Sequence, residues 1–264
     1  MANNSEQIVK LPFLETIRRS FLFVMVNFKD FAKISLPAFA VMIYEMSTNF
    51  QAICSIQPSG CEDSLRNKCS LILLGLVSIA LAVVYCRRII LKDIGDFWTI
   101  ASLRRIVSYF LYNIFLLFMI AFPSYLLIIL LSLLLSSVSL PENISYLLLL
   151  IPFGITMFLS RFFLVFPAVT VDDKTMKLKE SFFLTKGNVN RIFWGQIIMM
   201  LPGMVLLTVL SSAYNIVGSS SYLTNFIFTL LFVSLSFFDT CLKSSFYAHI
   251  YQYFTFYQKK KDEE

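Results

Sequence analysis

Two long stretches of the chain contain neither a charged residue nor a histidine. Residues 106–141 run for 36 positions, and residues 192–238 for 47 positions, without Asp, Glu, Lys, Arg or His. About 20 apolar residues are enough to cross a bilayer as an α-helix. The stretches are continuously apolar rather than alternating, and backbone groups in the hydrocarbon layer need partners within their own helix. The pattern predicts an all-α, polytopic membrane helix bundle.

The limits of the apolar segments predict six transmembrane helices in a single membrane domain. The expected spans lie near 34–54, 70–88, 110–136, 146–166, 193–213 and 222–242. An amphipathic interfacial helix is expected near 12–30, where apolar positions recur on one face. A second surface helix is expected near 174–186, with Asp173 as its cap and Gly187 ending it in a left-handed conformation. Span six is expected to continue as a helix towards residue 257.

Charged residues are scarce, and the positively charged ones lie almost entirely on one side of the predicted membrane. Hydrophobic residues form 58% of the chain, charged residues 14%, and the mean hydropathy is +0.75, which excludes an ordinary soluble domain. Every Lys and Arg except Arg66 and Lys68 falls on one side, which places both termini in the cytoplasm. This asymmetry accounts for the net charge of +6 without a nucleic-acid partner. The polar first ten residues do not form a cleavable signal peptide, so the first span is expected to direct insertion.

Three charged residues inside or at the edge of predicted spans are candidate functional groups, because an unpaired charge at mid-bilayer is costly. Glu45 is the deepest carboxylate of span one; it either handles an ion or proton, or lies at the outer interface. Arg161 and Asp239 approach the inner surface on spans four and six, where they either pair between helices or stay solvated. Asp239 equally has Lys243 within reach, four residues on.

Pro37, Pro123 and Pro202 lie within three of the predicted spans. Each proline either produces a packed kink or breaks its helix and exposes carbonyl groups to a transported substrate. Their spacing indicates either three parallel two-span repeats or a chance similarity between short apolar segments. A transporter further predicts that four polar side chains converge at mid-membrane: Glu45, Asn113, Ser124 and Gln196.

The five cysteines divide between the two predicted sides. Cys54 and Cys61 fall in the first outer loop, where an oxidising compartment permits a disulfide between them, and Cys69 lies at the end of that loop. No cysteine spacing matches a zinc site, and the single histidine, His249, forms neither a metal site nor a catalytic triad. The sequence contains no GxSxG, HExxH, CxxC or phosphate-binding glycine loop. It therefore indicates no catalytic residue, no cofactor and no metal.

The most specific segment lies between spans four and five. It reads Arg161-Phe-Phe-Leu-Val-Phe-Pro-Ala, then Asp172-Asp173, Glu180-Ser181-Phe, Thr185-Lys-Gly-Asn188 and Arg191. These residues, and the layout of most of the chain, resemble the six-helix bacterial inner-membrane proteins of the YciC type. They are also similar to the membrane domain fused to some glycerophosphodiester phosphodiesterases. The resemblance implies a multi-pass plasma-membrane protein without an assigned activity, because the 264 residues contain no phosphodiesterase domain.

These observations favour a non-enzymatic protein of the bacterial inner membrane that works as an interaction or envelope-maintenance component. Its expected partners are the lipid bilayer and either another membrane protein or a second copy of the chain. A small transporter with parallel two-span repeats is the alternative, and a membrane-embedded lipid enzyme comes third. The sequence identifies no small-molecule substrate.

Overall fold

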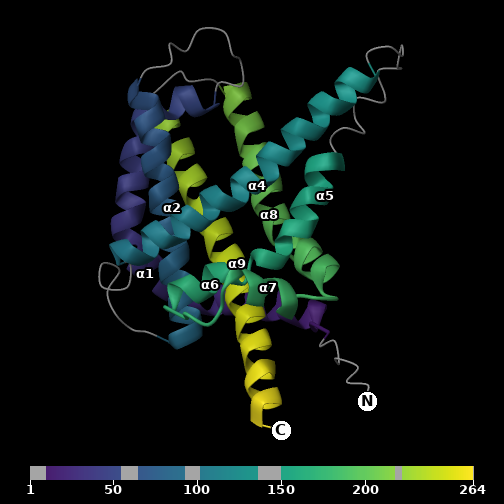
Figure 1. Cartoon of the computed structure of the whole chain (residues 1–264). Coiled ribbons are helices and arrows are strands. Elements are labelled where there is room, and N and C mark those ends of the chain that lie inside the picture. The colour runs from purple at the N-terminus through teal and green to yellow at the C-terminus, as the bar shows by residue number, and fades with distance from the viewer. Residues whose placement is uncertain (1–9, 55–64, 93–101, 136–149, 218–221, 264) are drawn as a thin grey trace, which may run out of the picture.

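The computed structural model describes residues 10–54, 65–92, 102–135, 150–217 and 222–263. All regular structure in these ranges is helical, and Figure 1 shows the helices packed as a bundle. In chain order they are α1 (Phe13–Cys54), α2 (Leu65–Leu91), α4 (Leu103–Leu135), α5 (Leu150–Leu159), the 3₁₀ turn η2 (Ser160–Phe162), α6 (Val165–Thr170), α7 (Leu178–Leu184), α8 (Val189–Val217) and α9 (Tyr222–Glu263). The prediction of an all-helical bundle is confirmed for the described part of the chain.

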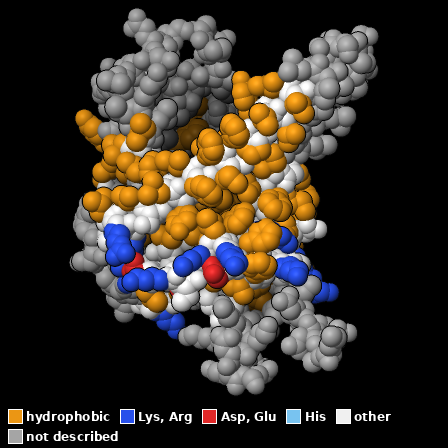
Figure 2. All heavy atoms as spheres, in the orientation of Figure 1, with side chains coloured by type: hydrophobic (Ala, Val, Ile, Leu, Met, Phe, Trp, Pro, Cys, Tyr) orange, Lys and Arg blue, Asp and Glu red, His pale blue; other side chains and the backbone are white. Residues whose placement is uncertain are grey.

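Three of the described helices are long and apolar enough to cross a membrane: Leu103–Leu127 within α4, Val189–Val217, and Leu223–Phe256 within α9. Many of their large apolar side chains stay exposed in the bundle, among them Leu117 and Phe118 on α4. Figure 2 shows this apolar surface above a band in which Lys and Arg side chains gather. Apolar surface of this extent marks contact with a membrane or a partner. The chain is a membrane protein.

α9 lies at the centre of the bundle and contacts α1, α2, α6 and α8. The core between α1, α2 and α9 is aromatic. The ring centroid of Tyr85 lies 4.9 Å from that of Phe31 and 5.8 Å from that of Phe237, and all three side chains are buried. Edge-to-face pairs at such distances are favourable beyond the area that they bury. This trio therefore fixes how α1 and α2 pack on α9.

α8 approaches α9 closely because two of its residues have no side chain. Gly195 and Gly203 are both buried. A Cβ on Gly195 would lie 2.1 Å from Phe246 Cζ, and a Cβ on Gly203 would lie 2.8 Å from Asp239 Oδ1. Small residues permit this kind of backbone approach between membrane helices. The close contact between α8 and α9 thus depends on glycine at both positions.

The structure differs from the sequence prediction at the start of the chain. The interfacial helix predicted over 12–30 and the span predicted over 34–54 form one continuous helix, α1, of 42 residues. Val24 and Phe31 belong to the same buried cluster as residues of α2 and α9, so the first half of α1 packs on the bundle. Residues 30–36 contain neither glycine nor proline, and nothing interrupts the helix there. Pro37 itself lies inside α1.

None of the three membrane prolines ends its helix. Pro37 lies inside α1, Pro123 inside α4 and Pro202 inside α8. In a membrane, neighbouring groups re-satisfy the backbone that a proline frees. The broken helices that a transporter would use are therefore not present at these positions.

The segment predicted as span four, 146–166, is not one helix in its described part. α5 ends at Leu159, and η2 leads from it into α6. Pro167 lies in the first turn of α6, where the missing N–H costs nothing. Pro167 cannot donate to the carbonyl of Phe163, which accepts from the N–H of Phe166 at 3.3 Å instead, and α6 begins as a separate short helix. The surface helix expected over 174–186 is also shorter, running from Leu178 to Leu184.

Gly195→Ala is expected to destabilise the bundle, because its Cβ would collide with the buried ring of Phe246. Forcing a methyl group into a filled contact costs about 1–3 kcal/mol. Thermal unfolding of the purified protein in mild detergent measures the effect. The matched control is Gly154→Ala on α5, where nothing lies within 4 Å of the new Cβ and Ala is the better helix former. Equal melting temperatures for the two variants would contradict the close α8–α9 contact.

Candidate functional site: the Asp172–Asp173 cluster

Two neighbouring carboxylates follow the end of α6. The chain reverses there in a Schellman motif: the N–H of Asp173 donates to the carbonyl of Ala168 at 3.0 Å, and the N–H of Asp172 donates to that of Val169 at 3.3 Å. The motif places its turn residue in the left-handed region, and Asp172 has a φ of 58°. Glycine is the usual residue at this position. Aspartate tolerates it and adds a carboxylate at the turn.

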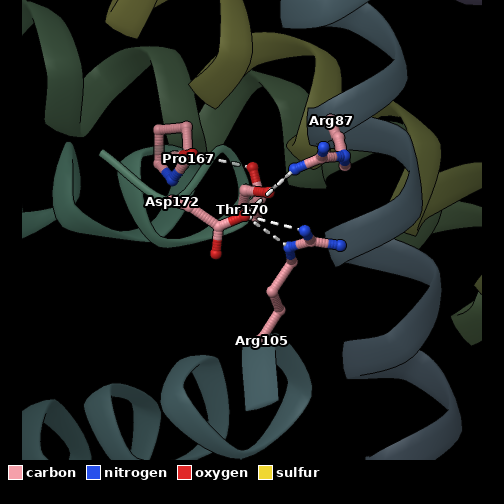
Figure 3. A network of polar contacts seen from close by, with 5 residues as sticks. All are labelled: Arg87, Arg105, Pro167, Thr170 and Asp172. Carbon is pink, nitrogen blue, oxygen red and sulfur yellow. Dashed lines mark hydrogen bonds and ion pairs between the residues drawn. The ribbon is translucent and has the colours of Figure 1, made fainter. Parts of the chain in front are cut away.

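The side chain of Asp172 joins α2 and α4 (Figure 3). Its Oδ2 accepts hydrogen bonds from Arg105 Nε and Nη2 at 2.9 and 2.7 Å, and lies 3.4 Å from Arg87 Nη1. Arg87 also donates to the carbonyl of Thr170 at 3.1 Å. The Arg87 and Arg105 side chains are only 17% and 16% exposed, whereas that of Asp172 is 47% exposed. One carboxylate thus holds α2, α4 and the end of α6 together.

Asp173 makes the second connection, to α9. Its Oδ2 accepts from the hydroxyl of Tyr251 at 2.5 Å, and its Oδ1 accepts from the backbone N–H and the hydroxyl of Thr175 at 2.9 and 2.6 Å. Asp173 was expected to cap the surface helix, but it closes the preceding turn instead. The reason is that Lys177 is extended, with φ −94° and ψ 174°, so α7 begins after it. Glu180 accepts the N–H of Lys177 at 3.1 Å.

Hydrogen-bond donors keep both carboxyl groups ionised. The hydrogen bond from Arg105 holds the pKa of Asp172 below 3.8, helped by the positive charges of Arg105, Arg87 and Arg104 and opposed by burial. For Asp173, burial acts to raise the pKa, but the hydrogen bonds from Thr175 and Tyr251 and from backbone N–H groups outweigh it and lower the pKa. A carboxyl group with a lowered pKa is a poor general base at neutral pH. The pair is suited to holding the structure.

Lys10 and Leu11, the described residues before Pro12 and α1, are bound by α9, by α8 and by the residue that precedes α8. The backbone N–H of Leu11 donates to Asn188 Oδ1 at 2.7 Å, and the carbonyl of Leu11 accepts from Arg191. The hydroxyl of Tyr253 donates to the carbonyl of Lys10 at 3.0 Å. Leu11 itself is fully buried. The N-terminal segment is therefore fixed to the bundle before α1 begins. Gly187, just before α8, has a φ of 79°, as the sequence predicted.

Arg161 and Asp239, the candidate interhelical pair, do not meet. Asp239 Oδ2 lies 2.5 Å from Lys243 Nζ, one turn along α9, because a local i,i+4 pair needs no movement of helices. Arg161 instead lies over the ring of Phe182, with 4.3 Å between its Cζ and the ring centroid. Of the two alternatives for Asp239, the structure shows the pair with Lys243.

Other candidates from the sequence fall outside the described residues. Glu45 lies within the range of α1, but its side chain is not described, and the same holds for Cys54 at the end of α1. Cys61 lies in a part of the chain that is not described at all, so the disulfide stays a prediction. Cys86 and Cys241 are buried free thiols.

Three of the four polar residues that a transport cavity would require lie in the described part of the chain: Asn113, Ser124 and Gln196. Ser124 Oγ donates to the carbonyl of Ile120 on its own helix at 2.6 Å. Gln196 is buried in α8, and its Nε2 has no hydrogen-bond acceptor among the described residues. Asn113 is half-buried on α4. Among the described residues no hydrogen bond joins any of these three side chains to another, and the side chain of Glu45 lies outside the described part.

Among the residues that the structure describes, no three His, Cys, Asp or Glu side chains gather in a way that could hold a metal ion. No family model, no curated protein and no solved structure matches the chain. The interpretation of the Asp172–Asp173 cluster therefore depends on its contacts.

Sequence reasoning missed the partners of the two carboxylates. The basic doublets Arg87-Arg88 and Arg104-Arg105 and the acidic doublet Asp172-Asp173 were visible in the sequence. Complementary doublets on one predicted side of the membrane were a usable signal for their pairing. Tyr251 carried no such signal, because it is one of several aromatic residues near the end of the chain.

Asp172→Asn is expected to destabilise the protein by about 1 kcal/mol, a low figure because solvent screens a carboxylate that is nearly half exposed. Asn keeps the left-handed turn but removes the charge that faces Arg87 and Arg105. Thermal unfolding in detergent measures the change. The matched control is Glu15→Gln, which breaks the exposed pair with Arg19 and should leave the melting temperature nearly unchanged. An equal loss in both variants would argue against a special role for Asp172.

Acid is expected to weaken the same cluster. The pKa of Asp172 and of Asp173 is lower in the folded protein than the ordinary 3.8, so their contribution to stability is complete above that value and is lost as pH falls through the folded-state pKa values. Melting temperatures recorded between neutral pH and about pH 3 measure this loss. The curve of Asp172→Asn should fall less steeply than that of the wild type in the acid range. Two parallel curves would show that Asp172 does not contribute.

Proposed function

We propose that the chain is a multi-pass protein of the bacterial inner membrane that acts, without chemistry of its own, as an interaction or envelope-maintenance component. In this proposal it crosses the membrane six times and keeps both termini in the cytoplasm. The proposal includes kinship with the YciC-type six-helix proteins, which the segment 161–191 resembles. It rests on the chain's own contacts and charge pattern.

The observation that carries the proposal is that the carboxylates of Asp172 and Asp173 are occupied by donors from the same chain. Asp172 and Asp173 accept hydrogen bonds from donors on α2, α4 and α9 of the same chain. A catalytic or ion-carrying carboxylate needs access to its substrate and a pKa suited to its task. These two carboxylates instead fix helices relative to one another. A fixed arrangement of helices suits a protein that presents a constant surface to a partner.

The same contacts weigh against transport. Alternating access moves one group of helices against another. Here α2 and α4 are tied to the turn after α6 through Asp172, and that turn is tied to α9 through Asp173. A rocking movement would have to break both connections. Ser124 and Gln196 are not joined to one another, since Ser124 donates to the carbonyl of Ile120 and Gln196 Nε2 has no acceptor among the described residues.

The proposed orientation is supported by the position of the cations. Figure 2 shows Lys and Arg side chains in a band along one margin of the apolar surface. Cytoplasmic loops carry the excess of these residues in membrane proteins. The margin that contains the Asp172–Asp173 cluster is therefore assigned to the cytoplasm in this proposal.

Purification of the tagged full-length protein in mild detergent tests the interaction role. The expected result is a complex of constant stoichiometry, either with a second membrane protein or with a second copy of the chain, measured by light scattering and mass spectrometry. Asp172→Asn should recover less of the complex than the Glu15→Gln control, because it loosens the helices. A C-terminal fusion to green fluorescent protein should fluoresce, and alkaline phosphatase inserted after residue 142 should be active.

Two results would contradict the proposal. A monomer that drives substrate-dependent uptake in proteoliposomes would replace the interaction role with transport. A C-terminus that lies outside the cell would reverse the orientation and leave the Asp172–Asp173 cluster on the other surface.

A further inference from the structure

Five arginines in the described chain are half-buried: Arg87, Arg88, Arg105, Arg161 and Arg191. Four of them meet an oxygen atom, from the carboxylates of Asp172 and Asp30 or the carbonyl of Leu11. Arg161 is the exception. Its Nε is buried without a hydrogen-bond acceptor, and no carboxylate pairs with its guanidinium in the part of the chain that the structure describes.

The guanidinium of Arg161 is nevertheless held in one place. Its Cζ lies 4.3 Å from the ring centroid of Phe182 and 6.0 Å from that of Phe158. The backbone is held as well, because the hydroxyls of Ser181 and Thr185 donate to the carbonyl of Arg161 at 2.6 and 3.2 Å. A guanidinium that lies over an aromatic ring keeps its planar fork of donors free for an anion. Arg161 is therefore a positioned cation with unused donors.

The surroundings of Arg161 are those of a membrane surface. Phe158 and Phe183 are 53% and 59% exposed, and α5, which carries Phe158, contains no charged residue. Lys179 on α7 and Lys186 just after it are exposed on the same short segment. Aromatic side chains next to cations mark the headgroup level of a bilayer. A ligand that brings an anion to Arg161 past these exposed aromatic rings is expected to have apolar groups next to that anion.

We infer that Arg161, Phe158 and Phe182 form a binding site for the phosphate group of an anionic phospholipid. The phosphate oxygens accept from Nη1 and Nη2, which have no acceptor among the described residues and are not buried, in the two-point geometry that guanidinium and phosphate share. The acyl chains lie against the exposed ring of Phe158 and the apolar surface of α5. A soluble phosphate offers the same oxygens but leaves these rings uncovered. The inference needs only the membrane location of the chain, and is independent of the six-span topology and of the proposed interaction role.

Native mass spectrometry of the full-length protein, purified in detergent and titrated with phosphatidylglycerol, tests the site. The wild type is expected to retain one tightly bound lipid. Arg161→Gln should lower the affinity for that lipid about tenfold, the effect of losing one charge-assisted bidentate contact. Arg161→Lys, which keeps the charge but loses the fork, should fall between the two. The matched control is Arg18→Gln, which removes an exposed charge from α1 and should leave the affinity unchanged.

Equal affinities for the wild type and Arg161→Gln overturn the inference. So does an equal loss in Arg18→Gln, which would indicate unspecific charge attraction. Displacement of the lipid by inorganic phosphate would assign the site to a soluble anion and overturn the lipid as its ligand. If Arg161→Gln does not fold, Phe182→Leu serves in its place. That variant removes the ring beneath the guanidinium and should weaken phosphatidylglycerol binding severalfold, and unchanged binding would overturn the site.

Discussion

The ion pair between Asp172 and Arg105 decides where α4 lies. α4 is a long apolar helix with few buried side chains: Tyr109, Leu116 and Ser124. Figure 1 shows it crossing the front of the bundle on a diagonal, and many of its described apolar side chains are exposed. Apolar contact with lipid does not prefer one helix position over another. The position of α4 therefore depends on its first turns, where Arg105 meets Asp172 and Tyr109 packs on Phe166.

Asp172 can reach Arg105 on α4 because α6 is a separate short helix that ends just before it. α5 ends at Leu159, and the chain turns back after α6, which runs only from Val165 to Thr170. The turn requires a left-handed residue, which glycine would supply at lower conformational cost. Glycine would remove the carboxylate that Arg87 and Arg105 share, and with it the connection from the turn to α2 and α4. The aspartate at this turn therefore serves the arginines of α2 and α4 as well as the turn itself.

The sequence predicted α4, α8 and α9 well because an uncharged run of 36 or 47 residues is a property of the chain itself. It predicted α1 poorly because Lys29, Asp30 and Lys33 looked like a boundary between surface and membrane. Charged residues do not end a helix, and Asp30 finds Arg88 on α2 at 3.9 Å. The connection of Asp173 to Tyr251 joins residues 78 positions apart. Such a partner depends on how α9 is rotated in the bundle, which local sequence does not specify.

In the described part of the chain no carboxylate pairs with Arg161, and Asp239, the partner that the sequence offered, forms a local ion pair instead. Asp239 lies next to Lys243 on its own helix, and that pair forms without ordering a second element. The chain has 22 Lys and Arg but 16 Asp and Glu, so cations without a carboxylate partner are to be expected even though a carboxylate such as that of Asp172 serves two arginines. On an exposed surface, water satisfies them at little cost. Arg161 is half-buried against Phe182, its Nε is closed off from solvent, and Nη1 and Nη2 are the donors that an acceptor from outside the chain can reach.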